Sequence, residues 1–260
     1  MKNRDRLILG IALGLLLFGA AGCDKLRARD HLNKGARAFK ATQYTSAVEH
    51  FKTAIELDPQ LPLARLYLAT AYAYMFIPGA DSEENLKVGN LAIEEFKKVL
   101  LEDPNNVNSV AGIANIYFNM KKLDEAKTWD QKHIALDPKS PEPYYSIGVI
   151  DWSLTYPRRM EAKAKAGIQP DQPIKDAKVR GPLCEQNQAA IEDSFQVLNK
   201  AIELRPDYAD AMAYLNLMWR EKADCESDPE ARAADLKKAD EWVDKTLDTR
   251  KKQANAPPPA

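Results

Sequence analysis

Glycine is scarce in this chain, with 11 among 260 residues, and no stretch of useful length alternates apolar and polar side chains. Such alternation is the pattern of a half-buried β-strand, so its absence argues against a sheet. Alanine, leucine, glutamate and lysine dominate instead, and apolar residues recur every three or four positions, as on one face of a helix. The sequence therefore predicts an all-α protein.

An excess of either charge is also missing. The chain holds 37 lysines and arginines against 38 aspartates and glutamates, which gives a net charge of −1. Proteins that bind nucleic acids neutralise phosphates with many basic side chains, so we expect no nucleic-acid partner.

Histidine is rare. His31, His50 and His133 are the three histidines, and they lie apart in the sequence. None has a cysteine or carboxylate at metal-ligand spacing, and no phosphate loop, nucleophile elbow or paired-carboxylate motif is present. We expect each histidine to be a surface or core residue. The sequence thus predicts no enzyme active site, no metal site and no cofactor.

The N-terminal region carries an apolar run over residues 7–18, preceded by Lys2, Arg4 and Arg6. The run is too short to span a bilayer comfortably, which favours a cleaved export signal over a membrane anchor.

Cys23 follows four small residues at positions 19–22, a pattern that resembles a bacterial lipobox, with Ala20 where that pattern usually has leucine. The resemblance implies that residues 1–22 are a signal peptide and that Cys23 is acylated, for example with palmitate, on a membrane facing the periplasm or the cell exterior. An uncleaved anchor and a plain secretory signal are the alternatives. Asp24 resembles an inner-membrane retention signal, but the leaflet stays open.

One pattern recurs along the chain, and its first copy is YTSAVEHFKTAIELDP at residues 44–59. It returns as LAIEEFKKVLLEDP, AKTWDQKHIALDP and SFQVLNKAIELRP, which end at Pro104, Pro138 and Pro206. Each copy has apolar residues on one helical face and stops where proline ends a helix. A recurring helical pair is too small to bury its own apolar face, so it must stack on its neighbours.

These units resemble tetratricopeptide (TPR) repeats, which are helix-turn-helix units of 34 residues. In the first unit the family's small and large positions are filled by Gly35, Ala38, Tyr44, Ala47, Phe51, Ala54 and Pro59. The resemblance implies an α-solenoid of about five repeats in a domain over residues 23–250, with repeats at 28–61, 62–106, 107–140, 141–208 and 209–250. We expect residues 251–260, which include three consecutive prolines, to form a disordered tail.

Repeats two, four and five exceed the family length. In repeat two, Asp81 or Ser82 with Glu84 predicts an early start of the second helix. Repeat four reads either as two repeats or as two extended helices around a proline-rich excursion at 156–182, and the frequent Pro and Gly residues favour the second interpretation. Its basic segment at 158–165 is predicted to be a solvated helix face.

Cys184 and Cys225 are the two remaining cysteines. The TPR resemblance implies a helical hairpin that turns near Pro206, with Cys184 22 residues before the turn and Cys225 19 residues after it. Both cysteines would then lie at the same end of the hairpin, within disulfide reach. We expect a bridge in an exported chain, and two free buried thiols are the alternative.

The working surface in this family is the concave face, lined by the first helix of each repeat. The family's groove positions fall on an aromatic and amide-rich set in this sequence: Leu32, Phe39, Leu66, Tyr74, Asn108, Asn115, Phe118, Asn119, Tyr145 and Trp152. Aromatic anchors and backbone-pairing asparagines suit an extended or helical peptide. The alternative is that these aromatic residues pack against the insertions, or that the excursion fills the groove.

The resemblance favours a membrane-anchored adaptor or scaffold that binds another envelope protein or a peptide segment. The alternative is a structural subunit of an envelope assembly, or a self-oligomer, that uses its outer face and insertions. The oligomeric state stays open in both cases.

Overall fold

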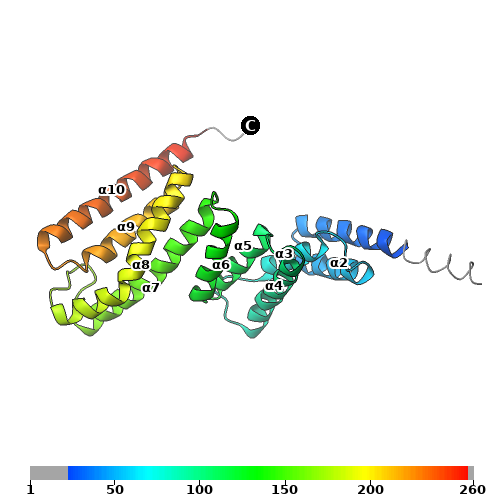
Figure 1. Ribbon diagram of the computed structural model, residues 1–260, viewed down its shortest axis with the longest axis horizontal. Helices are drawn as coiled ribbons and strands as arrows, with labels where there is room; N and C mark the ends of the chain where they lie inside the picture. The colour runs from blue at the N-terminus through cyan, green and yellow to red at the C-terminus, as the bar shows by residue number, and fades with distance from the viewer. Residues whose placement is uncertain (1–22, 257–260) are drawn as a thin grey trace, which may run out of the picture. The chain divides into compact units, whose positions relative to one another are not determined.

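The computed structural model describes residues 23–256, and every regular element in that range is an α-helix (Figure 1). This confirms the all-α prediction. The expected signal peptide at 1–22 and the three prolines at 257–259 lie outside the described residues. None of the helices over residues 23–256 has both the length and the hydropathy needed to cross a bilayer.

The chain divides after Lys122 into two compact units. In the first unit a helix over residues 23–40 is followed by α2 (Tyr44–Leu57), α3 (Ala64–Met75), α4 (Glu83–Glu102) and α5 (Val107–Asn119). Consecutive helices from α2 to α5 pack on one another. A Cβ atom at Gly35 would lie 2.5 Å from the ring of Phe51, so glycine is needed for this close approach of the first helix to α2.

The second unit holds the longer helices: α6 (Leu123–Leu136), α7 (Pro141–Lys165), α8 (Ala177–Leu204), α9 (Ala209–Ala223) and α10 (Pro229–Ala254). Consecutive helices pack together here as well, and α7 also contacts α9. The core of this unit is formed by Ile191, Leu198, Ala201, Ala211, Leu215 and Met218. Helical pairs stacked in this way bury an apolar face that no single pair could bury alone.

The insertion of repeat two lengthens α4 at its N-terminus. α4 begins at Glu83, and the Ser82 side chain accepts a hydrogen bond from the Asn85 N–H, so Ser82 is the N-cap. Asn85 also donates to the carbonyl oxygens of Ile77 and Ala80 at 2.8 Å each. One buried amide therefore fixes the loop that precedes the helix.

The predicted excursion at 156–182 is wrong in extent, because the irregular segment between α7 and α8 covers only residues 166–176. Pro157 lies inside α7 and Pro182 lies inside α8. α7 continues past Pro157 because it is packed along α8, where Asn187 donates a hydrogen bond to the Thr155 carbonyl oxygen at 3.3 Å. Pro182 is the sixth residue of α8, where it removes one helical hydrogen bond.

The prediction of a solvated basic face at 158–165 is wrong for two of its cations. The side chains of Arg159 and Lys163 are only 13% and 2% exposed and bind Asp224 at 2.8 and 2.5 Å. The Lys163 Nζ also donates to the carbonyl oxygens of Pro170 and Gln172, so it holds the irregular segment against α7. A charged residue is buried only with partners, and the shared carboxylate of Asp224 lies more than 60 positions away in the sequence.

The predicted tail at 251–260 begins too early, because α10 continues to Ala254. Gln253 donates to the carbonyl oxygen of Asp207 at 2.8 Å, and Arg250 pairs with Asp210 at 2.9 Å. Lys251 and Lys252 in the last turn also suit the negative end of the helix dipole. These tertiary contacts extend the helix beyond the repeat boundary.

Asp130 of α6 supports a prediction about pH. Burial raises the pKa of its carboxyl group to about 7, and a 2.5 Å hydrogen bond from the Ser146 hydroxyl opposes this only in part. A raised pKa means that the folded state holds this proton more tightly, so stability is lost as the pH rises from the ordinary value of 3.8 through about 7.

We expect Asp130→Asn to raise the free energy of unfolding at pH 8 by up to about 4 kcal/mol and to change it little at pH 4. Urea unfolding of both proteins at the two pH values measures this difference. A variant that is less stable than the parent at pH 8 would show that the ionised carboxylate is a net stabilising group.

Candidate functional site

An aromatic row runs along α7 and α9 in the second unit and contains two of the predicted groove residues. We define the aromatic row as Tyr208, Tyr145, Tyr214, Trp152 and Tyr156, in spatial order. Successive ring centroids are 4.9, 5.7, 5.6 and 4.9 Å apart, and Trp152 stacks on Tyr156. These spacings are those of interacting aromatic pairs. The five rings therefore form one continuous surface rather than isolated side chains.

An arginine side chain lies over the ring at each end of the aromatic row. The Arg205 guanidinium lies 4.5 Å from the Tyr208 ring centroid, and that of Arg159 lies 5.5 Å from the Tyr156 centroid. Both arginines also pair with carboxylates, Arg205 with Glu142 and Arg159 with Asp224. The row is thus uncharged along its length, and the positive charge at each end is balanced by a carboxylate.

Four of the rings, those of Tyr208, Tyr145, Tyr214 and Trp152, are half-buried with their inner side on the core of the second unit, and Tyr156 is 37% exposed. Burial raises the pKa of the Tyr208 phenol to about 12 and also raises the pKa values of Tyr145 and Tyr214. All three phenols are therefore neutral hydrogen-bonding groups at physiological pH. The buried indole N–H of Trp152 has no hydrogen-bond partner within the described part of the chain, and an unsatisfied buried donor costs about 1–3 kcal/mol.

In the first unit the structure brings Phe39 and Tyr74 together, with ring centroids 5.1 Å apart in an edge-on arrangement. Tyr44 completes this cluster at 5.3 Å from Phe39 and 5.6 Å from Tyr74. An open hollow of about 550 Å³ lies beside it, lined by Thr42, Gln43, Tyr44, Thr45, Ser46, Tyr74 and Met75. Tyr74 is 61% exposed, so this cluster is the more solvated of the two aromatic surfaces.

The remaining predicted groove residues of the first unit are more dispersed. Asn119 donates to the backbone and side-chain oxygens of Asn115 at 2.9 and 3.0 Å, so these two amides pair along α5. Asn108 is exposed. Leu32, Leu66 and Phe118 are half-buried.

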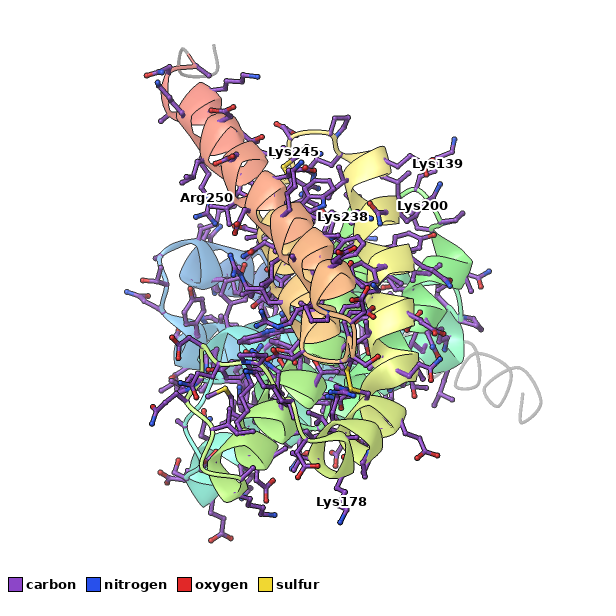
Figure 2. All side chains as sticks on the ribbon, turned by 90° about the vertical axis from the view of Figure 1, so that its left-hand side faces the viewer. Lys139, Lys178, Lys200, Lys238, Lys245 and Arg250 are labelled. Carbon is purple, nitrogen blue, oxygen red and sulfur yellow. A yellow bond between two sulfur atoms is a disulfide. The ribbon has the colours of Figure 1, made fainter. Side chains whose placement is uncertain are left out.

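The outer aromatic residues of the second unit are covered by lysines. The Lys238 Nζ lies 4.4 Å from the Trp219 ring centroid, and the Lys245 Nζ lies 4.1 Å from that of Trp242. Both lysines project from α10, the helix nearest the viewer in Figure 2. These cation–π contacts explain how the faces of the two tryptophan rings are covered.

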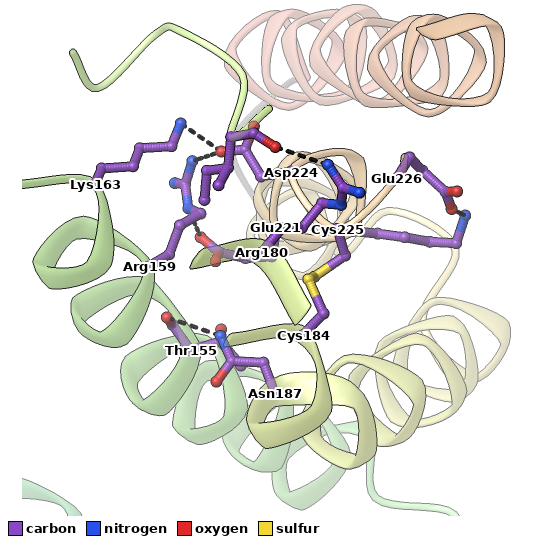
Figure 3. The surroundings of a disulfide bond; sticks show 12 residues. Thr155, Arg159, Lys163, Arg180, Cys184, Asn187, Glu221, Asp224, Cys225 and Glu226 are labelled. Carbon is purple, nitrogen blue, oxygen red and sulfur yellow. Dashed lines mark hydrogen bonds and ion pairs between the residues drawn. A yellow bond between two sulfur atoms is a disulfide. The ribbon is translucent and has the colours of Figure 1, made fainter. Parts of the chain in front are cut away.

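Cys184 of α8 and Cys225, just after α9, are joined by a disulfide, with their Cα atoms 5.4 Å apart (Figure 3). The bridge lies beside Asp224, which forms ion pairs with Arg159, Lys163 and Arg232. Asp224 is 4% exposed, so this is a buried ion cluster. Together the disulfide and the cluster join the irregular segment, α8 and the end of α9.

Two histidines that look unrelated in the sequence meet in the first repeat. The Nδ1 atoms of His31 and His50 are 3.3 Å apart, on the first helix and α2. No group of three or more His, Cys, Asp or Glu side chains in the described ranges is arranged to hold a metal ion. Cys23, the expected lipidation site, is an exposed free cysteine at the start of these residues.

Sequence reasoning missed three members of the aromatic row. In repeat five the family's groove positions fall on Asp210, Leu217 and Arg220. Tyr214 follows Asp210 by four positions and precedes Leu217 by three, so helical spacing places it on the same face of α9. Tyr156 could have been found by the same spacing from Trp152, but the expected excursion interrupted the helix there. Tyr208 precedes α9 as its N-cap residue, and no pattern in the sequence marks it.

Comparisons with known proteins agree with this architecture. No protein-family model and no curated protein matches the sequence. Among solved structures, MamA from Desulfovibrio magneticus RS-1 is 17% identical, with a TM-score of 0.58 over 87% of this chain and 97% of that one. YrrB, described as a TPR protein with an unusual peptide-binding site, is 15% identical, with a TM-score of 0.54 over 84% of each chain. The chain therefore has the fold of the tetratricopeptide-repeat proteins, an all-α solenoid of paired helices.

Proposed function

We propose that the protein binds a peptide segment of another protein and that the aromatic row of the second unit is the binding surface. The observation that carries the proposal is the row itself: five rings in unbroken contact, four of them half-buried and the fifth, Tyr156, 37% exposed. Half-buried aromatic rings offer large contact area at a small cost in conformational entropy, and such residues dominate binding energies at protein interfaces.

Hydrogen bonding supports a peptide as the ligand. The phenols of Tyr145, Tyr208 and Tyr214 are neutral and can donate or accept. YrrB, which shares the fold, is described as having a peptide-binding site, and this is consistent with a similar use of the fold here. Binding, rather than catalysis, is the activity we propose.

The proposed setting is the bacterial cell envelope. Acylation of Cys23 would tether the chain to a membrane, facing the periplasm or the cell exterior, and the disulfide suits such an oxidising compartment. A tether raises the effective concentration of the binding surface for partners at the same membrane. Incorporation of labelled palmitate that is lost in Cys23→Ser tests the anchor, and incorporation retained in that variant would refute it.

Substitutions on the aromatic row test the binding proposal. Tyr208→Ala combined with Tyr156→Ala removes the two end rings and leaves the three central rings in place. We expect the affinity for the envelope partner to fall at least tenfold, since each interface anchor contributes more than about 1 kcal/mol. Quantitative co-purification, followed by titration with the purified partner, measures the loss.

Leu247→Ala is the matched control, because Leu247 is a 59% exposed apolar residue of α10 outside the aromatic row. Partner binding should be unchanged in this variant. If the double tyrosine variant binds normally and Leu247→Ala does not, the outer face is the working surface. That result would favour the alternative of a structural subunit in an envelope assembly.

A further inference from the structure

The first repeat brings two histidine side chains into contact. His31 and His50 face each other from the first helix and α2, with their ring centroids 5.3 Å apart and their ring planes inclined at 60°. Both side chains are half-buried, so solvent reaches them. The peptide-binding proposal uses neither residue.

The close approach of the two histidines follows from the packing of this repeat. Gly35 is four residues after His31, on the same face of the first helix, and Phe51 follows His50 directly. Because a Cβ atom at Gly35 would lie only 2.5 Å from the Phe51 ring, the two helix backbones can approach this closely only with glycine there. The contact of Gly35 with the Phe51 ring, which packs this repeat, therefore also sets the distance between the two imidazole rings.

The separation fits a shared metal ion better than a direct hydrogen bond. The Nδ1 atoms are 3.3 Å apart, whereas N–H hydrogen bonds usually have donor–acceptor distances of about 2.7–3.2 Å. Zinc–nitrogen bonds of about 2.0–2.1 Å at a tetrahedral angle place two ligand nitrogens about 3.3–3.4 Å apart. We propose that His31 and His50 bind one late first-row divalent cation, Zn²⁺ or Cu²⁺, through their Nδ1 atoms.

Two protein ligands make this an open site. Residues 23–256 contain no cluster of three or more candidate ligand side chains, so water fills the other coordination positions. An open, solvent-accessible site exchanges its metal, unlike a closed four-ligand structural site. Imidazole is a good ligand for both ions, and Cu²⁺ should bind more tightly than Zn²⁺. The bound ion would clip the first helix to α2.

Isothermal titration of the Cys23→Ser protein in detergent with Zn²⁺ and with Cu²⁺ tests the site, because the serine removes any Cys23 thiol that could compete for the metal. We expect one binding site per chain that weakens at least tenfold in His31→Ala and in His50→Ala. His133→Gln alters the third histidine, which lies on α6 in the other unit, and should leave the site intact. Circular dichroism verifies that each variant is folded.

Electron paramagnetic resonance of the Cu²⁺-loaded parent protein gives a readout that needs no variant. Nitrogen hyperfine splitting from two imidazoles is the expected spectrum, and splitting from one or none would refute the proposal. Absence of binding up to roughly 1 mM metal, or equal binding by the parent and His50→Ala, would also overturn it.

Discussion

Replacing Asp224 by alanine should lower the free energy of unfolding of the second unit by about 3–5 kcal/mol, the usual cost of removing one partner from a buried ion pair. The carboxylate binds Arg159 at 2.8 Å, Lys163 at 2.5 Å and Arg232 at 3.5 Å. Without it, the buried Lys163 keeps only its two carbonyl partners, and Glu221, which Arg159 contacts at 3.0 Å, is the carboxylate that remains. A buried ammonium group that loses its carboxylate keeps the cost of desolvation and loses the attraction that offset it.

Urea unfolding of the parent and of Asp224→Ala measures this difference. Asp248→Ala is the control, because Asp248 is an exposed carboxylate on α10, and its loss should change stability by less than about 0.5 kcal/mol. Equal losses in the two variants would mean that the ion cluster adds nothing specific. Asp224→Asn separates charge from shape, since it keeps the side-chain volume and removes the negative charge.

Removing the disulfide should destabilise the same corner of the second unit by about 3–4 kcal/mol. Cys184 and Cys225 are 41 positions apart, and the chain-entropy model assigns a closed loop of this length a stabilisation of about 4 kcal/mol through the unfolded state. The loop contains most of α8 and all of α9. We expect the double variant Cys184→Ser, Cys225→Ser to unfold at a lower urea concentration than the parent.

The third cysteine provides the control for this experiment. Cys23 is free and exposed, so Cys23→Ser should leave the unfolding transition of the second unit unchanged. A double variant that unfolds at the parental urea concentration would show that the ion cluster alone holds this corner. Because Asp224 and Cys225 are neighbours, the losses from the two changes should not add when they are combined.

The sequence predicts those parts of the fold that local rules control. Helices that end before proline, an N-cap at Asp81 or Ser82, and the small and large positions of Gly35 and Phe51 each depend on residues close together in one repeat. Pro157 does not end α7, although proline usually ends a helix, because α7 packs along the neighbouring helix α8. Packing of α7 against α8 outweighs the lost hydrogen bond, and no local pattern contains that information.

The candidate sites show the same limit. The resemblance to TPR repeats pointed to Tyr145 and Trp152 as groove residues, and helical spacing could have added Tyr214. The contact between His31 and His50 depends on the pairing of two helices, and the partners of Arg159 lie on α9 and just beyond it, more than 60 positions away. Residue spacing in the sequence does not predict contacts that form only when separate helices stack on one another.

The central claim is that the aromatic row is a binding surface, and in-cell photocrosslinking tests it most directly. A photoreactive amino acid replaces Trp152, at the centre of the row, and another replaces Leu247 on α10 as the control position. The account predicts crosslinks from position 152, and not from position 247, to one other envelope protein, and their loss on addition of Tyr208→Ala and Tyr156→Ala. Crosslinks from position 152 only to residues of the same chain would contradict the claim, because the row would then be covered from within.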